Sequence, residues 1–218
     1  MINFLKIIFF FPIKFIKLLL IKLNNENFID QQNLKFKNIG LSRELGIENL
    51  NKIRKKFNLE PREMSSEHEV AFSALSLLSD FKPKNILEIG TYDAHNVKLM
   101  STLFKDAFID TIDLDDNDEN FKNFYNRNSK AKIEKFISER NKILKNLSHV
   151  KFFKKNSVKL LKENKKYDLI WIDGAHGYPT ITMDIVNSLR LINHNGVILC
   201  DDIYLEDLAQ PDKMYNSR

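Results

Sequence analysis

From residue 65 onward, short apolar runs alternate with longer amphipathic segments. Each run spans four to seven residues between charged or turn-forming residues, which is typical of a buried strand. Strands are predicted at 85–89, 108–114, 150–153, 168–172 and 197–200, and helices at 71–79, 97–104, 119–147, 158–163 and 180–191. The alternation predicts a mostly parallel sheet with helices on both faces, and Asn195–Gly196 is predicted to turn the chain into its last strand.

The first 64 residues follow a different pattern. Residues 1–23 are apolar except for Asn3 and four lysines, three of which fall with Asn3 within about 80° on a helical wheel. Residues 24–64 are polar and basic, with a short helix predicted over 48–57. We therefore expect a membrane-associating helix at 1–23, a linker with cover helices at 24–64 and an α/β domain at 65–218.

Charge separates the membrane hypothesis from a nucleic-acid one. Residues 1–60 hold 11 Lys/Arg and 5 Asp/Glu, while the remaining residues hold 23 and 24. The positive excess lies beside the apolar run, which favours an anionic membrane surface over nucleic acid. The lysines leave no uncharged span of about 18 residues, so we expect an in-plane anchor. A snorkelling signal anchor and a helix packed on its own domain stay open.

The single cysteine, Cys200, excludes an internal disulfide and fits a reducing compartment. Together with the basic apolar segment, this predicts a cytoplasmic protein that associates peripherally with a membrane.

Candidate ligand-binding residues follow the predicted strands, because ligands of parallel sheets bind beyond the strands' carboxyl ends. After the first strand, Gly90 permits a tight turn and a close backbone approach, although a plain strand-to-helix turn would use it too. After the second strand, Asp113 can accept both hydroxyls of a ribose. The alternative for Asp113 is a solvated acidic loop.

The fourth and fifth strands are followed by acidic residues and a histidine. Asp173, Asp201 and Asp202 would repel one another without a cation, and their oxygen atoms suit Mg²⁺ or another hard divalent ion. His176 is placed to reach a metal-held hydroxyl as a base. Helix caps are the alternative role for the single aspartates. Surface or capping roles are expected for the other histidines, His68, His95, His149 and His194.

These motifs resemble those of the class I S-adenosylmethionine-dependent methyltransferases. The closest resemblance is to the metal-dependent small-molecule O-methyltransferases of the catechol and macrolide-sugar type, and it covers about residues 67–203. Residues 88–91 resemble the first motif, Asp113 the acidic ribose contact, residues 168–176 the fourth motif, and residues 196–202 the fifth strand with its metal ligands. The cofactor contacts implied by the resemblance are Glu88, Gly90, Thr91, Tyr92, Asp113, Asn156, Ser157 and Asp173.

The resemblance implies a Rossmann-like three-layer α/β/α fold with an N-terminal helical extension. It implies methyl transfer from S-adenosylmethionine to a hydroxyl of a sugar or another small polar acceptor, with His176 as the base. Two departures stand out. Ala94 replaces a second glycine of the first motif, and only 16 residues follow Asp202, too few for the family's last two strands.

Two alternative functions stay open at this stage. The short C-terminus is compatible with a catalytically impaired, membrane-associated methyltransferase-like module. An NAD-dependent oxidoreductase is disfavoured, because the full GxGxxG pattern is absent after the first predicted strand.

Overall fold

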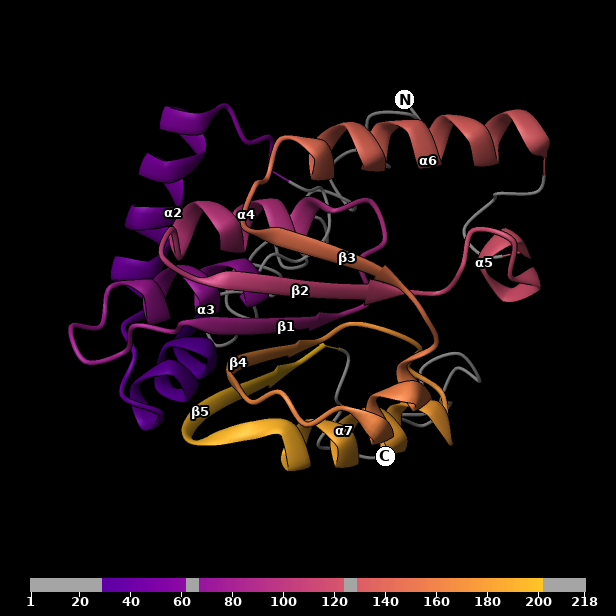
Figure 1. Cartoon of the computed structure of the whole chain (residues 1–218). Coiled ribbons are helices and arrows are strands. Elements are labelled where there is room, and N and C mark those ends of the chain that lie inside the picture. Colours follow the sequence, from indigo (N-terminus) through magenta and orange to yellow (C-terminus); the bar gives the residue numbers. More distant parts are fainter. Residues whose placement is uncertain (1–28, 62–66, 124–128, 202–218) are drawn as a thin grey trace, which may run out of the picture.

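A computed structural model describes residues 29–61, 67–123 and 129–201. Five parallel strands form one sheet in the order β3-β2-β1-β4-β5 (Figure 1). The strands are β1 Asn85–Ile89, β2 Phe108–Asp113, β3 Val150–Lys154, β4 Tyr167–Ile172 and β5 Ile192–Cys200. The chain runs from β1 outward to β3 and returns to the other side of β1, so the strand order reverses between β1 and β4. This topology confirms the predicted Rossmann-like α/β fold.

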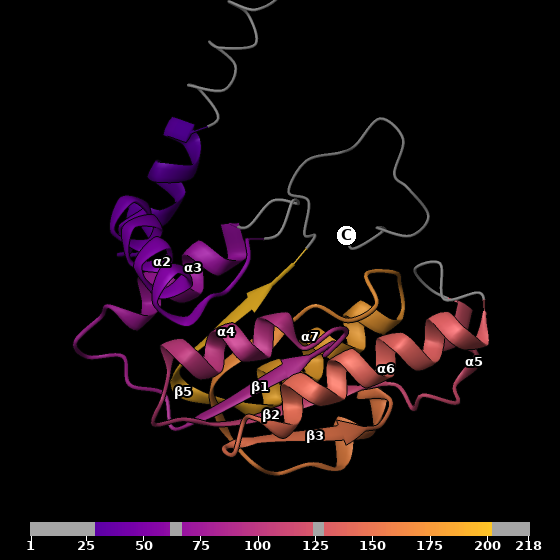
Figure 2. The ribbon, with the colours of Figure 1, turned by 90° about the horizontal axis from the view of Figure 1, so that it is seen from above.

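Helices cover both faces of the sheet, as the sequence predicts (Figure 1). Their bounds are α2 Arg43–Phe57, α3 Glu67–Ser76, α4 His95–Leu103, α5 Glu119–Asn123, α6 Lys130–Lys145, the 3-10 helix η1 Ser157–Lys162 and α7 Thr180–Leu191. Residues 29–38 are also helical. Figure 2 shows α4 and α6 lying over the sheet, with α2 and α3 at one side of it.

Alternate residues of β4 enter two separate apolar cores, because successive strand side chains point to opposite faces. In β4, Leu169 and Trp171 pack in the core beneath α3 and α4. The neighbouring residues Ile170 and Ile172 enter the other core with Leu160 of η1. This arrangement explains why β4 is a nearly continuous apolar run: both of its faces are buried.

Two sequence predictions about secondary structure are wrong. A single helix over 119–147 is excluded, because Ser129 has extended backbone angles and its side chain accepts a hydrogen bond from the Lys132 amide, which begins α6 as a separate helix. The turn at Asn195–Gly196 is replaced by strand, since β5 already starts at Ile192. Its pairing with β4 shifts register at this point, and the irregularity accommodates the extra residues.

Several predictions fall on residues outside the described ranges. These are the membrane-associating helix at 1–23, Asp202 and the absence of further strands after it. Among the residues that the structure describes, no helix is both long and apolar enough to cross a membrane.

Candidate active site

The register of the sheet brings the predicted site residues to a single edge. Strands β1, β2, β4 and β5 end at the same level of the sheet. At their carboxyl ends, Ile89 pairs with Ile112 and with Ile172, and Ile172 pairs with Cys200. Gly90, Asp113, Asp173 and Asp201 are the next residues of the chain, and they therefore stand side by side at the point where the strand order reverses. Ligands of open α/β sheets bind at such a point.

The loop after β1 approaches the end of β4 so closely that only glycine fits. Gly90 has a φ of +102°, and a Cβ atom added to it would lie 2.0 Å from the backbone oxygen of Asp173. Tyr92 and Ala94 also have positive φ values, 46° and 66°. Ala94 therefore has the left-handed conformation at the position where the methyltransferase family has glycine. Surrounding contacts must hold this conformation in place.

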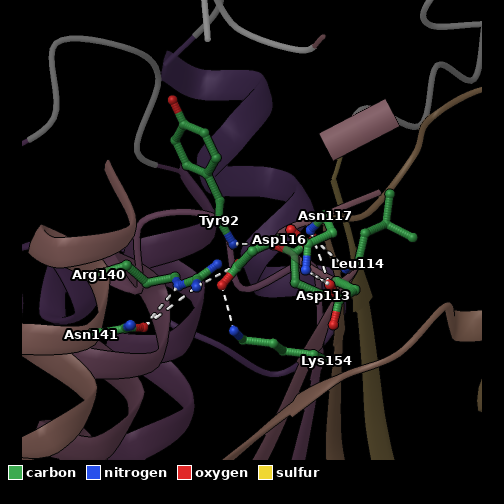
Figure 3. Close-up of polar contacts among 9 residues, drawn as sticks. Tyr92, Asp113, Leu114, Asp116, Asn117, Arg140, Asn141 and Lys154 are labelled. Carbon is green, nitrogen blue, oxygen red and sulfur yellow. Dashed lines mark hydrogen bonds and ion pairs between the residues drawn. The ribbon is translucent and has the colours of Figure 1, made fainter. Parts of the chain in front are cut away.

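Asp113 joins the loops after β1 and β2 (Figure 3). Its Oδ2 atom accepts a hydrogen bond of 2.8 Å from the Tyr92 amide, and its Oδ1 atom accepts one of 2.8 Å from the Leu114 amide. A carboxylate only accepts hydrogen bonds, and both of these donors are backbone N–H groups of the two loops. The two amides also fix the direction in which this carboxylate points.

Beneath this loop lies a buried chain of hydroxyl and carboxyl groups. The Thr111 hydroxyl donates to Glu88, and the hydroxyl oxygens of Thr91 and Thr111 are 2.6 Å apart. Burial raises the pKa of Glu88 well above its usual value, against the effect of Thr111, and the charges of Asp173, Asp113 and Asp93 raise it further. Glu88 and Thr91 thus support the loop from the protein interior.

Asp173 is the centre of a second polar group at the end of β4. Its Oδ1 atom lies 3.7 Å from Nε2 of His176, and its Oδ2 atom accepts a hydrogen bond of 3.2 Å from the side-chain Nδ2 of Asn96. The Asp201 amide donates to the Ile172 carbonyl, which holds Asp201 beside the end of β4. Within the described ranges, no group of three His, Cys, Asp or Glu side chains is arranged to hold a metal ion.

Asn156 and Ser157, two of the cofactor contacts that the resemblance implies, lie after β3. The Asn156 side chain accepts a hydrogen bond from the Val158 amide and so begins η1.

Asp184 of α7 is fully buried near this turn. Burial raises its pKa to about 6, against the effect of Ser157. A Cβ atom on Gly174 would lie 3.3 Å from the Asp184 carboxylate, so this acid also lies close to the loop after β4.

A family model described as a methyltransferase domain matches residues 87–203, which is more than half of the chain. The chain belongs to the class I methyltransferases. The matched residues begin in β1 and run past Asp201, so they include every strand end that forms the site. The family match gives no support to the nicotinamide-dependent alternative.

This chain is similar to solved structures of methyltransferases. The S-adenosylhomocysteine-bound methyltransferase PaMTH1 of Podospora anserina is 25% identical, with 72% of this chain and 62% of PaMTH1 covered at a TM-score of 0.45. The O-methyltransferase TomG of Streptomyces achromogenes is 16% identical, with 85% of this chain and 79% of TomG covered at a TM-score of 0.49. The chain thus spans less than two thirds of the length of PaMTH1. No curated protein sequence matches it.

Two histidines of the methyltransferase lie near the site and make contacts that the sequence did not indicate. His68 stacks on Trp171 with ring centroids 5.1 Å apart, and its Nε2 atom lies 3.3 Å from Oδ1 of Asn96. His95 begins α4, and its Nε2 atom lies 2.9 Å from a Glu69 oxygen. The predicted surface or capping roles of these two histidines are therefore wrong. Their contacts connect α3 to the first turn of α4. Neither histidine has a recognisable motif around it.

Replacing Asp184 by asparagine should change how stability depends on pH. The carboxyl ionises near pH 4 in the unfolded chain but only at about pH 6 in the folded one, so ionisation opposes folding. As pH rises from 4 to 6, the unmodified protein should lose up to about 3 kcal/mol of unfolding free energy relative to Asp184→Asn. Urea titrations of both proteins at pH 4, 6 and 8 measure this difference. A constant difference across the three pH values would contradict the burial effect.

Proposed function

We propose that this methyltransferase binds S-adenosylmethionine across the ends of β1, β2 and β4 and methylates a hydroxyl group of a small polar acceptor. The observation that carries the proposal is the hydrogen bond from the Tyr92 amide to Asp113. It joins the loops after β1 and β2 into one surface, with a carboxylate at the position that suits a ribose.

Each residue of that surface has a distinct role in the proposal. Gly90 lets the backbone approach the cofactor, and Asp113 accepts the ribose hydroxyls. Asn156 and Ser157 face the adenine side. Glu88, Thr91 and Tyr92 hold the loop in shape, as their buried or backbone contacts support. When bound, S-adenosylmethionine supplies a methyl group that is already activated by its sulfonium.

The second part of the proposal concerns the acceptor. Asp173, Asp201 and Asp202 would hold a divalent cation such as Mg²⁺, since carboxylate oxygens are its preferred protein ligands. The adjacent ends of β4 and β5 support this assignment for the first two aspartates. The cation would lower the pKa of the acceptor hydroxyl. The Nε2 atom of His176 would accept the hydroxyl proton while the acceptor oxygen bonds the methyl carbon, the bond from that carbon to the sulfonium breaks, and S-adenosylhomocysteine leaves.

Replacing Asp113 by alanine tests the cofactor site. The change removes the ribose acceptor and the anchor of the Tyr92 amide, so affinity for S-adenosylmethionine should fall at least about tenfold, or about 1.4 kcal/mol. Isothermal titration calorimetry of both proteins measures the change. Asp115→Ala is the matched control on the same loop, since Asp115 is exposed and its side chain bonds only within the loop. Equal affinities of the Asp113→Ala and unmodified proteins would exclude the ribose assignment.

We also propose a membrane location, with a sugar or a similar small molecule as the acceptor. The support is the composition of residues 1–23, which combine an apolar run with a lysine stripe. The intact chain should float with liposomes that contain anionic lipid, and binding should weaken in high salt and vanish when residues 1–23 are deleted. Flotation that persists without residues 1–23 would contradict the assignment.

A further inference from the structure

Asp116 ties the loop after β2 to two other elements (Figure 3). Its Oδ1 atom accepts a hydrogen bond of 2.8 Å from Nη2 of Arg140 in α6, and its Oδ2 atom accepts one from Lys154, the last residue of β3. Burial opposes ionisation of Asp116, but the hydrogen bonds from Lys154 and Arg140 lower its pKa below the usual value. Asp116 therefore stays charged and holds both cations at neutral pH.

Arg140 is fully buried, which is unusual for a charged side chain. Its guanidinium carbon lies 4.7 Å from the ring centroid of Phe152, and the rings of Phe121 and Phe136 lie within 6.0 Å. Within the described part of the chain, its Nη1 atom has no hydrogen-bond partner. A buried ion pair often contributes little net stability compared with apolar side chains, so stability alone does not explain this arrangement.

The cluster of Asp116, Arg140 and Lys154 is linked to the proposed ribose site by short contacts. Lys154 pairs with Asp113 across β2 and β3, and the next residue, Lys155, donates its amide to the Asp113 carbonyl at 2.7 Å. On the other side, the Phe136 ring of α6 lies 5.2 Å from the ring of Tyr92, whose amide binds the Asp113 carboxylate. The cluster thus holds α6 against both loops that meet at Asp113.

We propose that Arg140, Asp116 and Lys154 are positioning residues that set the affinity for the adenosine half of the cofactor. They fix the loop after β2, so that Asp113 points toward the ribose before the cofactor arrives. Preorganisation of this kind raises affinity because less ordering is needed on binding. The inference rests on the proposed function, in which the ribose of S-adenosylmethionine binds Asp113.

Asp116→Asn tests the inference, with Asp110→Asn as a matched control. Asp110 lies three residues before Asp113 on β2, and two donors hold it in the same manner, Lys165 and Tyr167. Both variants should lose unfolding free energy in urea. Only Asp116→Asn should also weaken the binding of S-adenosylmethionine and of adenosine, each by about tenfold in calorimetry. A merely structural role would make the two variants bind alike.

Three outcomes separate the hypotheses. If the unmodified chain binds S-adenosylmethionine and Asp113→Ala weakens binding, but Asp116→Asn binds both ligands normally, the positioning role is wrong and the proposed function stands. If the unmodified chain does not bind S-adenosylmethionine, both are wrong. A loss with Asp116→Asn for both ligands supports the positioning role.

Milder variants carry the same test if Asp116→Asn does not fold. Lys154→Met removes one of the two donors to Asp116, at a side chain that is 40% exposed. It should weaken the binding of S-adenosylmethionine and of adenosine about threefold. Arg140→Lys keeps the charge but not the planar group, so it should retain part of the affinity that Arg140→Met loses. Normal adenosine affinity in both Lys154→Met and Arg140→Met would overturn the inference.

Discussion

Gly90→Ala is expected to unfold much of the site, with a loss of about 3 kcal/mol or more in unfolding free energy. The new Cβ atom would meet the Asp173 carbonyl at 2.0 Å, and the backbone has a φ of +102° that alanine rarely adopts. Because both partners are backbone at the ends of hydrogen-bonded strands, neither can move without breaking the pairing of β1 and β4. Cofactor binding should be lost in the same variant.

Gly40→Ala is the control that separates the two causes. Gly40 also has a positive φ, +75°, but no atom lies within 4 Å of its added Cβ. It should lose only about 1 kcal/mol, the cost of the backbone conformation alone. Urea unfolding of the three proteins gives the comparison. Equal losses in the two variants would show that the contact between Gly90 and Asp173 is looser than described.

His176→Ala is expected to lower turnover by about a hundredfold while leaving affinity for S-adenosylmethionine unchanged. The reason is that His176 acts only when the acceptor hydroxyl loses its proton; its Nε2 atom lies 3.7 Å from Oδ1 of Asp173. Release of S-adenosylhomocysteine with a panel of sugars and catechols measures turnover. His194→Ala is the control, because His194 is exposed on β5.

Metal removal tests the other half of that mechanism. EDTA should abolish turnover and added Mg²⁺ should restore it, since the carboxylates of Asp173, Asp201 and Asp202 would repel one another without a cation. Activity that survives EDTA would show that these aspartates act without a metal. A His176→Ala variant as active as His194→Ala would exclude the base assignment.

Most of the fold could be predicted, because the central strands β1 and β4 are buried on both faces and therefore form short, mainly apolar runs. The prediction for 85–89 agrees with β1, and the helix 180–191 agrees with α7. The break at Ser129 was missed, because α5 and α6 on either side of it are both rich in the charged residues of an exposed helix. The irregular start of β5 depends on its pairing with β4, which a local pattern does not contain.

The residues of the candidate site also include some that the sequence predicts and some that it does not. Gly90, Asp113, Asp173 and Asp201 could be found from the sequence, because each follows a strand and the topology brings strand ends together. Contacts from distant elements could not. Arg140 is buried, whereas the other charged residues of α6 are exposed. Its partner Asp116 is one acidic residue among several in the loop after β2.

The central claim is that the ends of β1 and β2 form an S-adenosylmethionine site. Parallel calorimetric titrations of the unmodified chain with S-adenosylmethionine and with NAD test it most directly. We expect micromolar binding of S-adenosylmethionine, about −8 kcal/mol, and no heat of binding with NAD. Binding of NAD without binding of S-adenosylmethionine would contradict it.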